Sequence, residues 1–229
     1  MKKIIAALLI VGMIFTFAAC ADTNNDANST TESTSSSETG NAGTEVTKTA
    51  EEILDGMFET FLTNAMPAFG ASTIDEVKHY FVGMEKETIT ETDPTTGEEF
   101  SYEMPKNEPS VLSLEDVDVL SAMTYFPADS VSKVQDAAIF YNMMNMNVGG
   151  TYSAFRFANE EDVQAMATQM KNIFENNQWL CGFPDGYVIM SVDNVLLSVF
   201  AGNDFLTVFK DAVSSTYVEA TVLFEGAIM

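Results

Sequence analysis

Apolar residues recur along this chain with two different periods, which predict where helices and strands lie. The spacing of one helical face occurs at 53–62, 74–84, 114–120, 163–174 and 206–213. Alternation with polar residues, or a continuous apolar run, predicts strands at 87–92, 98–104, 134–146, 151–158, 187–192, 195–201 and 217–225. Strand, strand and helix therefore follow one another twice after residue 134. This order predicts an α+β fold: an antiparallel sheet with helices packed on one face, preceded by extra N-terminal helices.

Short polar motifs predict where several of these elements begin and turn. Thr49 and Glu52 have the spacing of a capping box, so the first helix is expected to begin after Thr49 and to stop at Pro67. Asp193-Asn194 suits the tight turn of a hairpin. The segment 67–106 is expected to be an insertion, and it contains a peripheral two-stranded ribbon around the turn 93–97.

The first residues have the three-part layout of a secretory signal. Lys2 and Lys3 precede an apolar run at 4–17, and the small residues Ala18 and Ala19 precede Cys20. The run is shorter than the ~20 residues that a membrane-spanning helix needs. We therefore expect residues 1–19 to be a signal peptide that is removed.

Residues 17–20, Phe-Ala-Ala-Cys, resemble a bacterial lipobox, with Phe17 in place of the usual leucine. The resemblance implies that Cys20 becomes the lipidated N-terminal residue and holds the chain on the outer face of the cell membrane, where two or more acyl chains anchor firmly. The alternative is an ordinary cleavage site at 19–21 and a freely secreted protein. The segment 20–48 is almost entirely small and polar, which predicts a disordered tether before a single domain at 49–229.

The composition excludes several kinds of partner and site. With 10 basic and 34 acidic residues, the chain keeps 8 against 34 once Lys2 and Lys3 are removed, a net charge of −26. We expect no nucleic-acid partner, because phosphates would be repelled. If Cys20 is acylated, Cys181 is the one thiol left, so no internal disulfide can form, and we expect it to be a buried apolar residue. His79 is the single histidine, too few for a histidine-rich metal site.

Four segments together resemble a known family: the helix start at 114–117, the strands at 141–147 and 154–157, and the helix after Asn159. They are similar to an uncharacterised family of lipoproteins of Gram-positive bacteria that carry a C-terminal domain of unknown function. The likeness covers about 49–216, interrupted at 67–106. It implies location and fold class, but no activity and no site residues.

Two motifs invite a chemical interpretation. Ser130 and Lys133 have the Ser-x-x-Lys spacing of penicillin-recognising enzymes, but the accompanying Ser-Asp-Asn and Lys-Thr-Gly elements do not occur, which favours a solvated connector. Met143, Met144 and Met146 carry sulfurs that suit Cu(I), but alternation along a strand separates them, so core packing is the simpler interpretation.

The acidic clusters are predicted to have structural roles and not to bind ions. Residues 160–162, Glu-Glu-Asp, occupy the first turn of a helix, where carboxylates stabilise the positive end of the dipole. The turn 93–99 lacks the ligand spacing of a calcium loop. We therefore predict no catalytic, cofactor-binding or metal-binding residue, and no cofactor.

These observations favour a lipid-anchored extracytoplasmic protein that binds a small molecule or a protein without catalysing a reaction. Its membrane contact would be made through lipidated Cys20. The first alternative is an extracytoplasmic hydrolase that uses carboxylates, which leave no linear signature. Acids brought together in a closed cleft, with pKa values shifted apart, would favour that alternative. A further alternative is cation handling by the acidic surface.

Overall fold

The computed structural model of the chain describes residues 48–179 and 182–228, all within the unit Glu45–Met229. The expected signal peptide at 1–19, Cys20, the part of the expected tether up to residue 47 and Cys181 lie outside the described residues. The helices are α1 (Ala50–Phe69), α2 (Asp75–Lys78), α3 (Val117–Thr124), the 3-10 helix η1 (Ala128–Lys133), α4 (Glu160–Asn176) and α5 (Asn203–Thr216). The strands are β1 (Phe81–Val82), β2 (Lys86–Thr92), β3 (Glu99–Pro105), β4 (Ser110–Val111), β5 (Val134–Asn142), β6 (Thr151–Phe157), β7 (Gly186–Val192), β8 (Val195–Ala201) and β9 (Thr221–Ala227).

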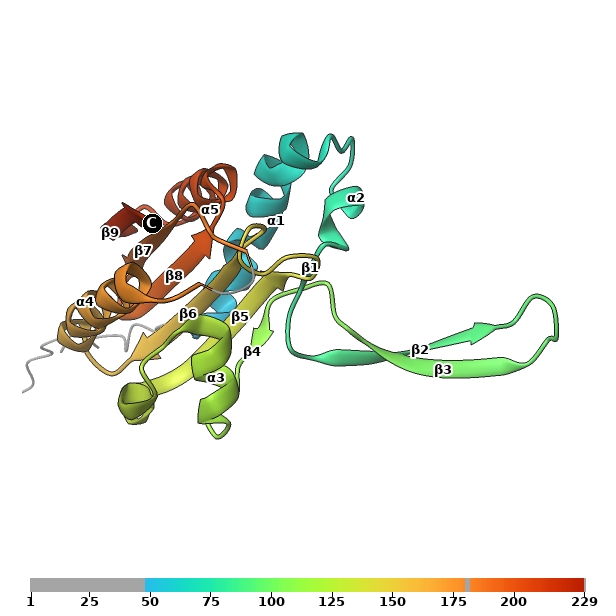
Figure 1. Ribbon diagram of the computed structural model, residues 1–229, viewed down its shortest axis with the longest axis horizontal. Coiled ribbons are helices and arrows are strands. Elements are labelled where there is room, and N and C mark those ends of the chain that lie inside the picture. The colour runs from blue at the N-terminus through green and yellow to red at the C-terminus, as the bar shows by residue number, and fades with distance from the viewer. Residues whose placement is uncertain (1–47, 180–181, 229) are drawn as a thin grey trace, which may run out of the picture. The chain divides into compact units, whose positions relative to one another are not determined.

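One antiparallel sheet forms the centre of the fold (Figure 1). Its strand order is β1-β5-β6-β8-β7-β9, and β4 also pairs with β5. The two predicted strand–strand–helix units are β5-β6-α4 and β7-β8-α5, and β6 pairs with β8 where the units meet. The predicted α+β class with an antiparallel sheet is therefore confirmed.

The helices cover both faces of the sheet, so the expectation that they pack on one face is wrong in that detail. Phe140 of β5 packs with α1 and α5 in one core, and its neighbour Ile139 packs with α3 and α4 in the other. The physical reason lies in β7 and β8, in which every residue except the half-exposed Ser191 is buried. Such continuous apolar strands need a helical layer on each side.

The predicted capping box starts α1. The Thr49 hydroxyl accepts the Glu52 N–H at 3.1 Å, and the Glu52 carboxylate accepts the Thr49 N–H at 2.8 Å. The Asp136 carboxylate of β5 accepts the next free N–H, that of Ala50, at 2.8 Å. The helix continues past Pro67 to Phe69 and ends where Gly70 takes a left-handed conformation (φ 62°).

Three predicted elements have different bounds in the structure. The helix predicted at 74–84 is limited to α2, because Phe81 joins β1 and pairs with Asn142. The helix predicted at 114–120 begins at Val117 and continues to Thr124, because the Asp116 carboxylate caps it by accepting the Val119 N–H at 3.1 Å. The strand predicted at 134–146 ends at Asn142. The side-chain oxygen of Asn142 accepts the N–H groups of Met144 and Asn145, which turns the chain.

Candidate functional site

Strands β2 and β3 form a ribbon that projects from the rest of the described domain (Figure 1). We call residues 86–105 the arm. No residue of the arm is buried. At its tip the Asp93 carboxylate accepts the N–H groups of Thr95 and Thr96 at 2.7 and 3.2 Å, which lowers the pKa of Asp93 and closes the turn. A two-stranded ribbon without a covered face is marginally stable in water, so the arm's exposed surface is where a binding partner would add stability.

One face of the arm presents apolar side chains in a row. Because paired residues share a face of a ribbon, the register places Ile89 beside Tyr102 and Glu91 beside Phe100. The rings of Phe100 and Tyr102 lie nearly parallel, with centroids 6.1 Å apart, and Phe100 remains 48% exposed. The Tyr102 hydroxyl donates to the Glu91 carboxylate at 2.7 Å. We call Ile89, Phe100, Tyr102 and Met104 the apolar row.

The opposite face of the arm is polar and carries Glu99 and Glu103, whereas Glu87 and Glu91 lie on the face of the apolar row. Thr90 and Ser101 share a hydrogen bond of 2.8 Å across the two strands. Glu103 lies 3.7 Å from Lys86, and both side chains are more than 60% exposed, so this pair adds little stability. Over both faces the arm carries one lysine and six carboxylates, a net charge of −5. The carboxylates are Glu87, Glu91, Asp93, Glu98, Glu99 and Glu103.

Hydrogen bonds fix the root of the arm. The N–H of Lys106 donates to the Glu85 carbonyl at 2.8 Å, so the two ends of the arm leave the domain side by side. The hydroxyl of Ser110, which is 1% exposed, accepts the N–H groups of Met84 and Glu85 at 2.5 and 3.2 Å. A Cβ at Gly83 would lie 2.4 Å from that oxygen, so only glycine fits here. The arm therefore leaves the domain from a fixed base.

A hollow of about 290 Å³ lies beside the root of the arm, between β4 and α3. Val111 and Val119, which are 49% and 37% exposed, give it an apolar wall. Glu85 and Asp116 stand at its rim. The hollow thus repeats the chemistry of the arm, apolar surface edged by carboxylates.

Glu51 and Asp55 on α1 extend this acidic surface. Burial raises the pKa of Glu51, and the negative charges of Asp55 and Glu85 raise it further. Burial and the charge of Glu108 raise the pKa of Asp55. An acid–base pair of a hydrolase needs two carboxyl groups whose pKa values move apart. Here both pKa values move in the same direction, and burial is the largest cause for each, so the two carboxyl groups do not have the opposed shifts of an acid–base pair.

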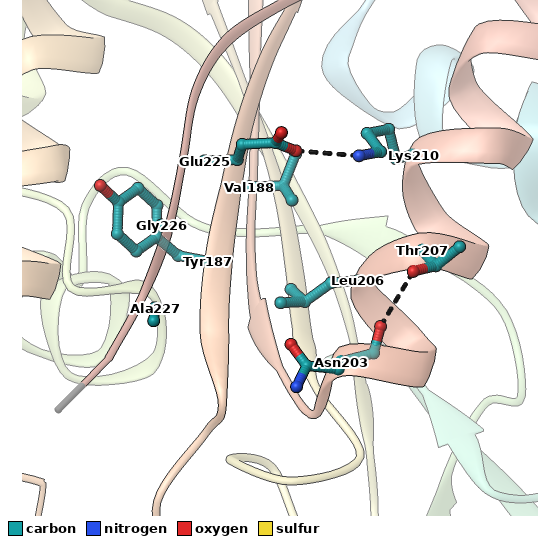
Figure 2. A pocket seen from close by; sticks show the side chains of 9 residues that line it. All are labelled: Tyr187, Val188, Asn203, Leu206, Thr207, Lys210, Glu225, Gly226 and Ala227. Atoms are coloured by element: carbon teal, nitrogen blue, oxygen red, sulfur yellow. Dashed lines mark hydrogen bonds and ion pairs between the residues drawn. The ribbon is translucent and has the colours of Figure 1, made fainter.

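A second hollow of about 290 Å³ lies between α5 and the edge strand β9 (Figure 2). Its charged groups pair with each other, since the Lys210 ammonium lies 2.9 Å from the Glu225 carboxylate. The Thr207 hydroxyl donates to the Asn203 carbonyl at 3.1 Å. The Tyr187 ring of β7 points away from this hollow to the opposite face of the sheet, where its hydroxyl donates to Glu175 of α4 at 2.8 Å. With its charges neutralised internally, this hollow is a weaker candidate than the arm and its root.

The residues of the Ser-x-x-Lys motif contact different partners. The Ser130 hydroxyl lies 3.5 Å from the Gln169 side chain, and the Lys133 ammonium lies 3.6 Å from Asp162. Both partners belong to α4, so the motif connects η1 to that helix rather than joining a nucleophile to a base.

The methionines of the Cu(I) interpretation lie in the loop after β5. Met143 and Met144 are 42% and 73% exposed, and Met146 is half-buried. The expectation of core packing is therefore wrong for Met143 and Met144. His79 is exposed and lies against Tyr80, with ring centroids 4.0 Å apart and the ring planes tilted by 39°.

Within residues 48–179 and 182–228, no group of three or more histidine, cysteine or acidic side chains is placed to hold a metal ion. The helices of that same part of the chain are all too short or too polar to cross a membrane.

The sequence predicted the ribbon but did not identify it as a site. The signal was present in 98–104, where Phe100, Tyr102 and Met104 alternate with glutamates and a serine, and none of these residues is buried in the described structure. The hollow at the root had no comparable signal, because its wall comes from the two-residue strand β4 and a helix that packs beside it.

Comparison with known proteins adds no assignment to this geometry. No family model, no curated protein and no solved structure matches the chain.

Proposed function

We propose that this chain is a lipid-anchored binding protein on the outer face of the cell membrane and that its arm contacts the partner. One observation carries the proposal. The arm carries four large apolar side chains in one row, of which Phe100 is exposed and the other three are half-buried, on a ribbon with no buried residue. Exposed apolar surface rimmed by polar groups marks interaction sites. The lipobox resemblance at Cys20, and the lipoprotein family that the sequence resembles, support the location.

The arm suits binding better than catalysis. Its side chains reach solvent on both faces, so they cannot exclude water from a reacting group. Its fixed root, held by Ser110, reduces the freedom that the arm would lose on binding. These are properties of a preorganised docking element.

Photo-crosslinking in the producing cells tests this role of the arm. A photoreactive phenylalanine analogue at position 100 should give adducts of higher mass after irradiation, because Phe100 faces the proposed partner. The control places the same analogue at Val218, which is 96% exposed in the turn before β9. Equal adduct yields at both positions, or none at position 100, would contradict the proposal.

Fatty-acid labelling tests the anchor. Cells fed an alkyne-tagged fatty acid should label the wild-type chain, and Cys20→Ser should abolish the label, because the thiol carries the lipid. Cys181→Ser is the matched control and should keep the label, since these are the two cysteines of the chain. Label that persists in the Cys20→Ser chain would show that the lipobox interpretation is wrong.

A further inference from the structure

The outer edge of β3 is open, and this edge determines what kind of partner fits the arm. Within the described residues β3 pairs with β2 alone, so one side of its backbone has no neighbouring strand. An open edge accepts an extended polypeptide, whose backbone N–H and C=O groups complete the ladder.

Side chains of β3 divide by charge between the two faces of the arm. Phe100, Tyr102 and Met104 lie on the face of the apolar row. Glu99 and Glu103 lie on the opposite face with Ser101 between them. A strand added beside β3 places its own side chains alternately over these two faces. The complementary strand therefore alternates apolar residues with lysine or arginine.

The carboxylates of this edge are available to a partner. Glu99 has no ion-pair partner within the described residues, and Glu103 has the exposed Lys86 at 3.7 Å. The arm's net charge of −5 disfavours another acidic surface, including a second copy of this chain, whose net charge is −24. Strand β2 is less suited to this role, because its polar face carries Lys86 and three threonines instead of acids.

We propose that the β3 edge binds an extended cationic polypeptide segment in which apolar and basic residues alternate, paired as an added strand. This inference rests on the proposed function and names the partner's chemistry. The apolar row covers the partner's apolar side chains, and Glu99 and Glu103 contact its basic ones.

The test measures binding of the purified full chain, in uncharged detergent, to a labelled synthetic peptide in which lysine and valine alternate. We expect saturable binding by fluorescence anisotropy. The double variant Glu99→Gln/Glu103→Gln should raise Kd by roughly tenfold. Phe100→Ser should also raise Kd by roughly tenfold, because it interrupts the apolar row. Added salt should weaken binding to the wild type more than to the double variant.

A matched control separates the edge from the charge of the whole chain. Glu161→Gln/Asp211→Asn removes the same two charges from exposed sites on α4 and α5 and should leave Kd unchanged. A peptide N-methylated at alternate amides cannot pair as a strand and should not bind. Equal effects of the two double variants, equal binding of the methylated peptide, or equal binding of a glutamate–valine peptide would each overturn the inference.

The two proposals fail in different ways. Position 100 could give cellular adducts while Glu99→Gln/Glu103→Gln leaves the Kd of the lysine–valine peptide unchanged. The arm would then bind a partner of another chemistry, and only this inference would be wrong. Adducts of the chain with itself would identify a second copy as the occupant and overturn the cationic partner. If position 100 gives no adduct, both the proposal that the arm contacts a partner and this inference are wrong.

Discussion

Phe61→Ala is expected to lower the free energy of unfolding by about 3–5 kcal/mol, the cost of truncating a fully buried aromatic ring. Phe61 of α1 is 0% exposed. Its ring lies 5.0, 5.2 and 4.8 Å from the rings of Phe81, Phe140 and Tyr152. These neighbours belong to β1, β5 and β6, so the substitution opens a cavity where α1 covers three strands. A loss of this size is a large part of the ~5–15 kcal/mol that stabilises most domains.

Chemical unfolding of the purified protein, followed by circular dichroism, measures this loss. Phe100→Ala is the matched control, since the same side chain is removed from the exposed arm. We expect Phe100→Ala to change the free energy of unfolding by less than about 0.5 kcal/mol. Similar losses for the two variants would contradict the packing of α1 on the sheet.

Gly56→Ala is expected to destabilise the protein by about 1–3 kcal/mol, although alanine favours a helix over glycine by about 1 kcal/mol. A Cβ at position 56 of α1 would lie 2.2 Å from the hydroxyl oxygen of Tyr217, which must then move. That hydroxyl donates to the Ile53 carbonyl at 2.9 Å. Tyr217 is 4% exposed, and burial is the main reason why its pKa rises to about 12. The clash therefore breaks the hydrogen bond that joins the end of α5 to α1.

A double-mutant cycle with Tyr217→Phe isolates this clash. Tyr217→Phe alone should cost about 1 kcal/mol for the lost hydrogen bond. Without the hydroxyl, the nearest atom to the new Cβ is the ring carbon at 3.4 Å, an ordinary contact. Gly56→Ala/Tyr217→Phe should then be at least as stable as Tyr217→Phe. Unfolding free energies that simply add would refute the clash and leave Gly56 unexplained.

The sequence predicted best the elements whose causes are local. The capping box of Thr49 and Glu52 needs only adjacent residues, and it forms. The hairpin at Asp193-Asn194 forms for the same reason, with Asp193 at a positive φ of 48°. Distant contacts caused the errors. Phe81 has helical spacing from Ile74 and Val77, yet pairing with Asn142 makes it a strand residue.

The sequence did indicate that helices pack on both faces of the sheet, although the prediction placed them on one face. Strands β7 and β8 are continuous apolar runs, a pattern typical of strands buried on both faces. Only the tertiary structure shows that α1 and α5 supply one layer and α3 and α4 the other. The candidate site was harder to predict, because the alternation at 98–104 is compatible with a covered strand as well as with an open arm.

The hydrogen bond between Lys106 and Glu85 closes the base of the arm. The number of residues beyond it can therefore change without altering the rest of the domain. Strands rise by about 3.3 Å per residue and alternate faces, so adding or deleting two residues in each strand would shift the tip by about 7 Å and keep every side chain on its face. The packing of the sheet and of both cores would not change. Variants of this protein can therefore differ in how far the arm extends from the domain while the domain itself stays the same.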